Sequence, residues 1–275
     1  MHKTYRYKLI QKSVLTRLLI GAVVLFASLQ AGAQDMYKIA IIIDDLGNNF
    51  SKGEKLINMP YQMTYAILPD RPYSVRLANL AAESGKEVMV HLPMQSSQHQ
   101  ELGNNGLTID LSQEQFKQAV IKSIDAVPHA KGVNNHMGSL LTRHPGHMTW
   151  LMEVLSLKGE GFYFVDSKTT ARTIASQIAR EHFVPNITRD VFIDSSQNES
   201  DIKKQLEYLT RLAKENGYAV GIGHPYSATI KILVKYLPTL TEHNIEIVPV
   251  AKLVELNTEK QWPRYSFRLP TVVKN

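Results

Sequence analysis

Short apolar segments alternate with amphipathic segments along most of this chain, and this alternation limits the possible fold more than any other feature. Segments rich in β-branched residues are typical of strands buried on both faces, and segments with helical periodicity lie between them. Because repeated β–α alternation builds parallel sheets through right-handed crossovers, we predict an α/β fold. Seven or eight such units favour a (β/α) barrel or a distorted (β/α) barrel, and an open doubly wound sheet is the alternative. The predicted strands are residues 38–43, 62–67, 88–92, 132–136, 162–165, 191–193, 218–223 and 245–250, and the predicted helices are 51–58, 72–84, 112–126, 146–158, 170–181, 199–215 and 227–239.

Residues 1–33 predict a signal peptide rather than part of the fold. Five basic residues lie before an apolar stretch at 18–29, which is too short to span a bilayer. An Ala-Gly-Ala cleavage pattern follows and ends at Ala33. We therefore expect export to the periplasm, with an uncleaved membrane anchor as the alternative. The rest of the chain divides into a domain at 34–256 and a tail at 257–275, which we expect to be extended because it lacks periodicity.

Charge and cysteine content exclude several classes of function. The predicted signal segment carries five of the 31 basic residues and none of the 25 acidic ones, so the net charge of +6 falls to +1 without it. This balance gives no support to nucleic-acid binding. The chain has no cysteine, which excludes disulfides, thiolate catalysis and cysteine zinc sites. It also lacks a phosphate-binding glycine loop and a G-x-S-x-G elbow, which argues against nucleotide-binding and serine-hydrolase functions.

Four predicted strands end on side chains that bind metals or transfer protons. Parallel strands bring their carboxyl ends to one rim, where α/β proteins place their active sites. We therefore expect these side chains to meet in one site. They are Asp44, Asp45, His91, His136 and His224.

The pair Asp44-Asp45 follows the most hydrophobic strand. Two adjacent carboxylates at a buried strand end repel each other, so one of them needs a cation or a raised pKa. This favours a metal ligand beside a general base, and an ordinary Asp-rich turn is the alternative. Because side chains alternate along a strand, both carboxylates face one site only if the chain turns there, as Gly47 would allow.

The histidines complete a candidate metal site. Asp45, His91 and His136 could form a three-ligand site with a position open for water, as catalytic zinc requires, and zinc is our preference among the first-row metals. Asn134 shares a face with His136 and could bind or orient the same ligand. For His224, whose neighbours are small, we favour a general acid over a fourth ligand.

Two further strand ends carry acidic residues. Asp166, followed by Ser167, and Asp194 could each orient a histidine or bind substrate hydroxyls, and helix N-capping is the equal alternative. Our candidates for substrate binding are Asn134, Asp166 and Ser167, and we count Asp194 among the candidate catalytic residues.

Five motifs occur in order between about Tyr37 and Leu256. They read Ile-Ile-Ile-Asp44-Asp45-Leu-Gly, His91-Leu-Pro-Met, Gly-Val-Asn-Asn-His136-Met-Gly-Ser, Phe-Val-Asp166-Ser and Gly-His224-Pro. Together they resemble the divergent polysaccharide deacetylase family, the YibQ-like group. The resemblance implies a distorted, seven-stranded β/α barrel related to the NodB-type carbohydrate esterases, which use a divalent metal to remove acetyl groups from chitin-like sugars, peptidoglycan or xylan.

The resemblance also implies a role for each matching residue. Asp44 corresponds to the general base, Asp45 to the metal-binding carboxylate, and His91 and His136 to the histidine ligands. His224 corresponds to the general acid, and Asp194 or Asp166 to the carboxylate that holds this acid in place.

The chain departs from the NodB pattern at its histidines. NodB enzymes take both histidine ligands from one His-x-x-x-His segment, whereas Gln95 stands four residues after His91 and Leu140 four residues after His136. No Arg-x-Pro-Tyr run follows the site either. We predict a metal-dependent deacetylase of an acetylated polysaccharide or peptidoglycan fragment. A glycan-binding or envelope-assembly protein without turnover is the first alternative, and a glycosidase with paired carboxylates is the second.

Overall fold

One parallel sheet organises the protein. The computed structural model describes residues 36–262 except residues 99, 104 and 160, so the predicted signal peptide lies outside the described residues. The strand order is β6-β5-β4-β3-β2-β1-β8-β7, with β9 paired to the start of β1, and all the pairings between these strands are parallel. The strands are β1 (Tyr37–Leu46), β2 (Thr64–Ile67), β3 (Glu87–Met94), β4 (Ala130–Met137), β5 (Tyr163–Asp166), β6 (Asn186–Thr188), β7 (Val191–Phe192), β8 (Tyr218–Gly223) and β9 (Ile245–Ile247).

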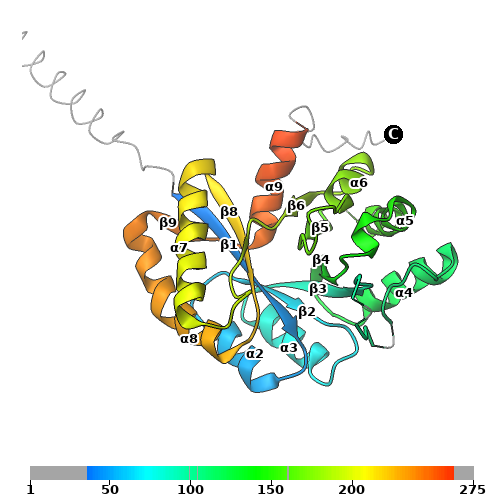
Figure 1. The fold of residues 1–275 in the computed structure, drawn as a ribbon. Helices are drawn as coiled ribbons and strands as arrows, with labels where there is room; N and C mark the ends of the chain where they lie inside the picture. The colour runs from blue at the N-terminus through cyan, green and yellow to red at the C-terminus, as the bar shows by residue number, and fades with distance from the viewer. Residues whose placement is uncertain (1–35, 99, 104, 160, 263–275) are drawn as a thin grey trace, which may run out of the picture. The chain divides into compact units, whose positions relative to one another are not determined.

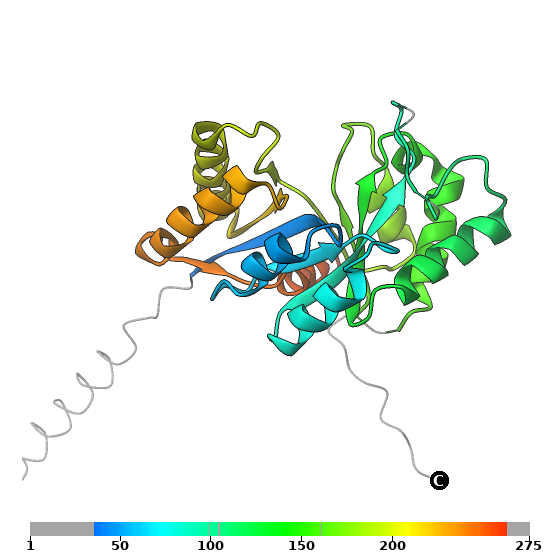
Figure 2. The same cartoon turned by 90° about the horizontal axis from the view of Figure 1, so that it is seen from below.

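The sheet curls into a half-barrel, with helices alternating with its strands (Figures 1 and 2). In the described part of the chain, β6 and β7 stand at the two ends of the strand order and are not paired with each other. The predicted distorted β/α barrel is therefore confirmed, with its seam between these two strands.

The helices begin and end mostly where the local sequence predicts. Ser112 and Gln115 form the predicted capping box of α4, and Gly217 ends α7 in a left-handed conformation with φ of 89°. No helix within residues 36–262 is long and apolar enough to cross a membrane. The helices are α2 (Phe50–Ile57), α3 (Ser74–Glu83), α4 (Gln113–Asp125), α5 (Pro145–Ser156), α6 (Ala175–Glu181), α7 (Glu199–Asn216), α8 (Ser227–Tyr236) and α9 (Val250–Gln261), and two 3₁₀ helices cover Leu141–Arg143 and Leu237–His243.

The structure contains two elements that the sequence pattern does not predict. Strand β6 has three residues, too few for a clear period. Helix α9 takes the place of the end of the predicted strand 245–250 and continues into the predicted tail, where residues 257–261 are helical rather than extended. The cause is a short apolar stripe, Val250, Leu253 and Val254, which packs against the inner face of the sheet. The rest of the predicted tail lies outside the described residues.

Side chains of the strands divide between two apolar clusters, one on each face of the sheet. On β1, Ile39, Ile41 and Ile43 belong to an outer cluster shared with the surrounding helices. Ala40 and Ile42 belong to an inner cluster that also contains the buried residues of α9. This alternation has a period of two, so it decides which residues at the strand ends can face the barrel interior.

A buried polar network joins α9 to the amino ends of two neighbouring strands. The Thr64 hydroxyl donates to Glu87 Oε2 at 2.7 Å and accepts from the Val250 amide at 2.9 Å. The Ala251 amide donates to Glu87 Oε2 at 3.3 Å. Glu87 thus supplies an anion at the first turn of α9, where free amides favour negative charge. Burial raises the pKa of Glu87 above its usual range.

We expect Thr64→Val to lower the free energy of unfolding by about 1–3 kcal/mol, because it leaves the buried Val250 amide and Glu87 without their shared partner. Urea denaturation would show this as a lower midpoint at an unchanged slope. Thr241→Val, at an exposed position, is the matched control. Equal midpoints for the two variants would contradict a stabilising role for this network.

Candidate active site and metal centre

The carboxyl ends of β1, β3, β4 and β8 bring most of the predicted site residues together. Asp44, His91 and His224 each stand two residues after a member of the inner cluster, so they continue the inward-facing rows of their strands. Asn134 lies directly beside His91 in the register between β3 and β4, and His136 stands beside Pro93. The site therefore forms at the open rim of the barrel interior.

Asp45 departs from the alternation of β1. Strict alternation would point its side chain toward the outer helices. Instead, Asp45 has a left-handed backbone with φ of 58°, and the β1–β2 register shifts between Ile43 and Leu46. Asp is among the few non-glycine residues that tolerate this conformation. This irregularity brings both adjacent carboxylates to the same site.

Three ligand atoms face one another at the centre of the site. Asp45 Oδ1 lies 3.2 Å from His91 Nε2 and 3.0 Å from His136 Nδ1, and the two ring nitrogens are 3.0 Å apart. Tetrahedral zinc with ordinary bond lengths needs ligand atoms about 3.3 Å apart. Asp45 Oδ1 is buried and has no properly aligned hydrogen-bond donor. Both the donor set and this unpartnered oxygen fit a divalent metal ion.

Asn134 links the two functional parts of the cluster. Its side chain is fully buried, its amide nitrogen donates to Asp44 Oδ1 at 2.7 Å, and its carbonyl oxygen lies 2.8 Å from His91 Nδ1. Because the amide oxygen can only accept, His91 Nδ1 carries the proton and its Nε2 lone pair is free for a metal. Both polar atoms of Asn134 are thus used within the protein, rather than by the ligand that the sequence led us to expect.

The charges of the cluster depend on one another. Burial raises the pKa of Asp44. Burial would raise that of Asp45 as well, but the neighbouring His136 and His91 imidazoles hold the pKa of Asp45 below its usual range. Burial opposes a charge on His91, yet Asp44 and Asp45 raise its pKa. The raised pKa favours a proton on His91, and this positive charge offsets the two carboxylates as a bound cation would.

His224 stands on the other side of Asp45, in a fixed orientation. Its Nε2 lies 3.9 Å from Asp45 Oδ2, and its Nδ1 lies 2.8 Å from Asp194 Oδ1. Asp194 Oδ2 also accepts from the His224 amide at 2.7 Å and from the Thr229 hydroxyl at 2.7 Å. Burial lowers the pKa of His224, but Asp194, Asp44 and Asp45 outweigh it and raise this pKa to about 9.

The remaining predicted residues lie at the rim but outside this cluster. Asp166 follows the outward-facing Phe164 by two residues, so its carboxylate faces away from the barrel interior. It accepts from the Lys168 amide and the Thr173 hydroxyl, both at 2.8 Å, and holds the loop that delays the start of α6 to Ala175. The Ser167 hydroxyl is buried without a hydrogen-bond partner in the described structure.

Several residues join the site that the motifs do not identify. Phe192 and Tyr226 both stack on the His224 ring, each with its ring centroid 5.3 Å from that of His224. The guanidinium of Arg189 lies over the Phe192 ring, 4.8 Å from its centroid. Phe192 and Tyr226 each stand two residues from a predicted site residue, Asp194 and His224. Their spacing of two residues could therefore have identified them from the sequence. Nothing in the sequence identifies Thr229, whose hydroxyl donates to Asp194.

Comparisons with known proteins identify the family and two relatives of this chain. The family described as "Divergent polysaccharide deacetylase" matches residues 41–254. YibQ of Escherichia coli strain K12, a protein named as uncharacterized, is 36% identical over 217 residues, which cover 79% of this chain and 67% of YibQ. An uncharacterized protein of Haemophilus influenzae is 34% identical over 216 residues, covering 78% of this chain and 76% of its own.

A solved structure shares the fold. The crystal structure of the uncharacterized protein ATU2773 from Agrobacterium tumefaciens C58 superposes with a TM-score of 0.76 at 22% identity, over 81% of this chain and 91% of that one. The family match itself covers most of the chain, including most or all of each strand that carries the candidate site residues. The chain therefore belongs to the divergent polysaccharide deacetylase family.

Proposed function

We propose that this protein is a periplasmic, metal-dependent deacetylase that removes acetyl groups from an acetylated polysaccharide or peptidoglycan of the cell envelope. Membership of the deacetylase family supports the reaction class. The signal sequence that we expect in residues 1–33 supports the compartment. The periplasm gives such an enzyme direct access to envelope glycans.

One observation carries the proposal. Asp45, His91 and His136 each direct one ligand atom to the same point, and a candidate base and a candidate acid stand beside them. Asp44 Oδ2 lies 3.6 Å from His91 Nε2, and His224 Nε2 lies 3.9 Å from Asp45 Oδ2. A hydrolase needs these three functions within the length of one acetyl group.

Asp44 is the residue that we assign to water activation. A divalent ion held by Asp45, His91 and His136 would polarise the acetyl carbonyl and acidify a water molecule. Burial raises the pKa of Asp44 toward the range in which a carboxylate accepts a proton effectively. The Asn134 amide holds the other oxygen of Asp44, so the free oxygen faces the site in one orientation.

His224 is the residue that we assign to protonation of the leaving group. Asp194 accepts from Nδ1, which leaves Nε2 as the atom that gives its proton to the departing amine or hydroxyl. The stacked Phe192 and Tyr226 rings restrict the rotation of the imidazole. Since the raised pKa keeps His224 protonated at neutral pH, it starts the reaction as an acid.

Zinc is the metal that we propose. Two imidazoles and one carboxylate at these spacings match catalytic zinc sites, which keep a fourth position open. The chain has no thiolate that would compete for the metal.

We expect the purified protein to release acetate from chitooligosaccharides or peptidoglycan fragments and to stop when a chelator is added. Asp44→Asn should lower the rate by about 10²–10⁴-fold, the usual contribution of a general base, and should keep the bound metal and the bound sugar. Asp110→Asn, at an exposed position, is the control. Sugar binding without acetate release from the unaltered protein would instead identify a glycan-binding protein, and shorter sugar chains would identify a glycosidase.

We expect about one divalent ion per chain by elemental analysis. Asp45→Ala and His136→Ala should abolish binding, and Asn134→Leu should weaken it about 10–100-fold, because His91 would lose the partner that fixes its protonated nitrogen. His243→Ala, at an exposed histidine that ends the 3₁₀ helix Leu237–His243, should change nothing. Full metal content in the Asp45 and His136 variants would refute the assigned ligand set.

The pH dependence of the rate should report on His224. An acid works only while protonated, so the rate should persist up to the raised pKa of about 9 and fall at higher pH. Asp194→Asn removes a negative charge and an acceptor, so the alkaline fall should move to lower pH, toward the ordinary value of 6.5. Asp190→Asn, an exposed residue whose carboxylate likewise accepts from a backbone amide, that of Val220, is the control. An alkaline limb that stays in place in Asp194→Asn would exclude His224 as the acid.

A further inference from the structure

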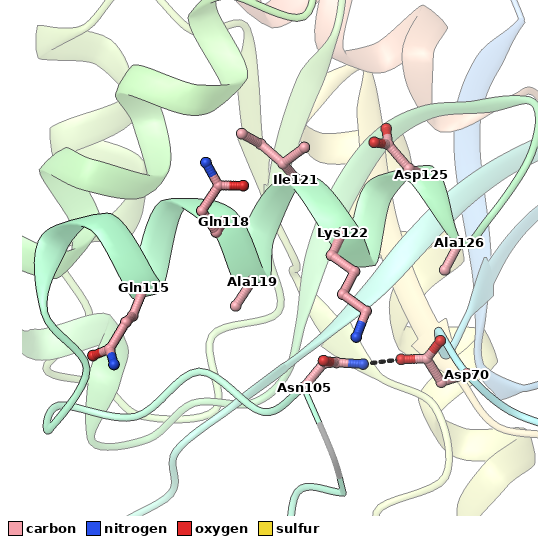
Figure 3. A pocket seen from close by; sticks show the side chains of 9 residues that line it. All are labelled: Asp70, Asn105, Gln115, Gln118, Ala119, Ile121, Lys122, Asp125 and Ala126. Atoms are coloured by element: carbon pink, nitrogen blue, oxygen red, sulfur yellow. Dashed lines mark hydrogen bonds between the residues drawn. The ribbon is translucent and has the colours of Figure 1, made fainter.

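A groove of about 780 Å³, lined by both polar and apolar groups, runs along α4. One face of α4 forms one wall, and the loops after β2 and β3 form the other (Figure 3). Lys122 points toward Asp70 and Asn105, which are hydrogen bonded to each other across these loops (Figure 3). Ala119 and Ala126 on the same stretch of helix leave room between the polar side chains.

This groove continues toward the candidate active site. A smaller hollow of about 100 Å³ shares Asp70 and Asn105 with it and extends to Arg71 and Pro93. Pro93 stands two residues after His91 on β3, so both point to the same face of the strand. The two adjacent hollows, which we call the path, extend from the outer surface of α4 to Pro93, which lies beside His136 in the β3–β4 register.

Arg71 occupies the middle of this path. A side chain at Gly47, two residues after Asp45, would lie 2.9 Å from Arg71 Cβ, and one at Gly103 would lie 3.4 Å from an Arg71 guanidinium nitrogen. Glycines at these two positions thus leave space on both sides of Arg71. Arg71 Nε is buried and has no hydrogen-bond partner in the described structure, so it has a donor to offer a ligand.

The lining favours sugars over other polymers. Amides, carboxylates and one ammonium group match the hydroxyl and acetamido groups of a glycan, which donate and accept at closely spaced positions. The small alanines accommodate the apolar face of a sugar ring. A docked peptide would need pockets for large apolar anchors, and Ile121 is the one large apolar side chain in this lining.

We propose that this path binds further sugar units of the same glycan strand, so that the protein acts on residues within a polymer. The proposal rests on the proposed deacetylase function, since it extends the same site. It assigns Lys122, Asp70 and Arg71 to substrate recognition at a distance from the reacting acetyl group.

Sugar binding to the Asp44→Asn variant tests this proposal, because this variant should bind the sugar but release very little acetate. We expect N-acetylchitohexaose to bind about tenfold more tightly than diacetylchitobiose, the factor that one or two additional hydrogen bonds supply. Lys122→Ala should remove most of this difference, and so should Ala119→Phe, which fills the groove. Lys214→Ala is the matched control, because Lys214 occupies the last turn of α7 as Lys122 occupies the last turn of α4.

The outcomes separate this proposal from the proposed function. Equal affinity for the two sugars, or a length preference that survives both groove variants, would overturn the strand-binding path even if acetate is released. A Lys122-dependent length preference without acetate release would support the path and refute the deacetylase. If a sugar-free peptidoglycan stem peptide binds more tightly than the hexaose, and Lys122→Ala weakens that binding, the proposal is overturned and the groove is assigned to peptide.

Discussion

The repulsion between two adjacent carboxylates at the end of a buried strand is the constraint on which the rest of the site depends. Asp44 and Asp45 leave the most hydrophobic strand of the protein together, and Asp44 is almost fully buried. Two such charges are costly unless positive charge or hydrogen bonds offset them. The Asn134 amide, the His91 and His136 imidazoles and His224 all converge on these carboxylates. The same convergence that offsets the electrostatic cost brings three candidate ligand atoms, a candidate base and a candidate acid into one cluster.

The alternation of side chains along the strands explains how much of this could be predicted. Asp44, His91, Asn134 and His224 continue inward-facing rows, so their meeting at the rim follows from counting residues. The same count shows why Asp166 stays outside the cluster, because it continues the outward-facing row of Phe164. Asp45 could not be derived in this way, since its inward position depends on a left-handed backbone and a register shift. Helix α9 was also beyond prediction, because its short apolar stripe acquires meaning only against the inner face of the sheet.

The two ends of the barrel use buried polar groups in different ways. At the amino ends of the strands, Glu87 and Thr64 are hydrogen bonded to each other and to amides of α9, and their network closes that end. At the carboxyl ends, two imidazole nitrogens face Asp45 Oδ1 without an aligned hydrogen bond, and the Ser167 hydroxyl is buried without a hydrogen-bond partner in the described structure. Satisfied networks stabilise a fold, whereas unsatisfied groups cost stability and mark positions where a ligand completes the bonding. The polar groups at the amino ends of the strands therefore stabilise the fold, whereas those at the carboxyl ends are the candidates for ligand binding.

The missing His-x-x-x-His segment does not prevent a metal site, because neighbouring strands can replace a local pair. His91 on β3 lies beside Asn134 on β4, and His136 stands one period further along β4 on the same face. The two imidazoles consequently approach within 3.0 Å although 45 residues separate them. A local pair would depend on the conformation of one loop, whereas this pair depends on the register of two central strands. The register also places Asn134 where its one amide group contacts both Asp44 and His91, so the same strand pairing fixes the positions of the candidate base and of a candidate metal ligand.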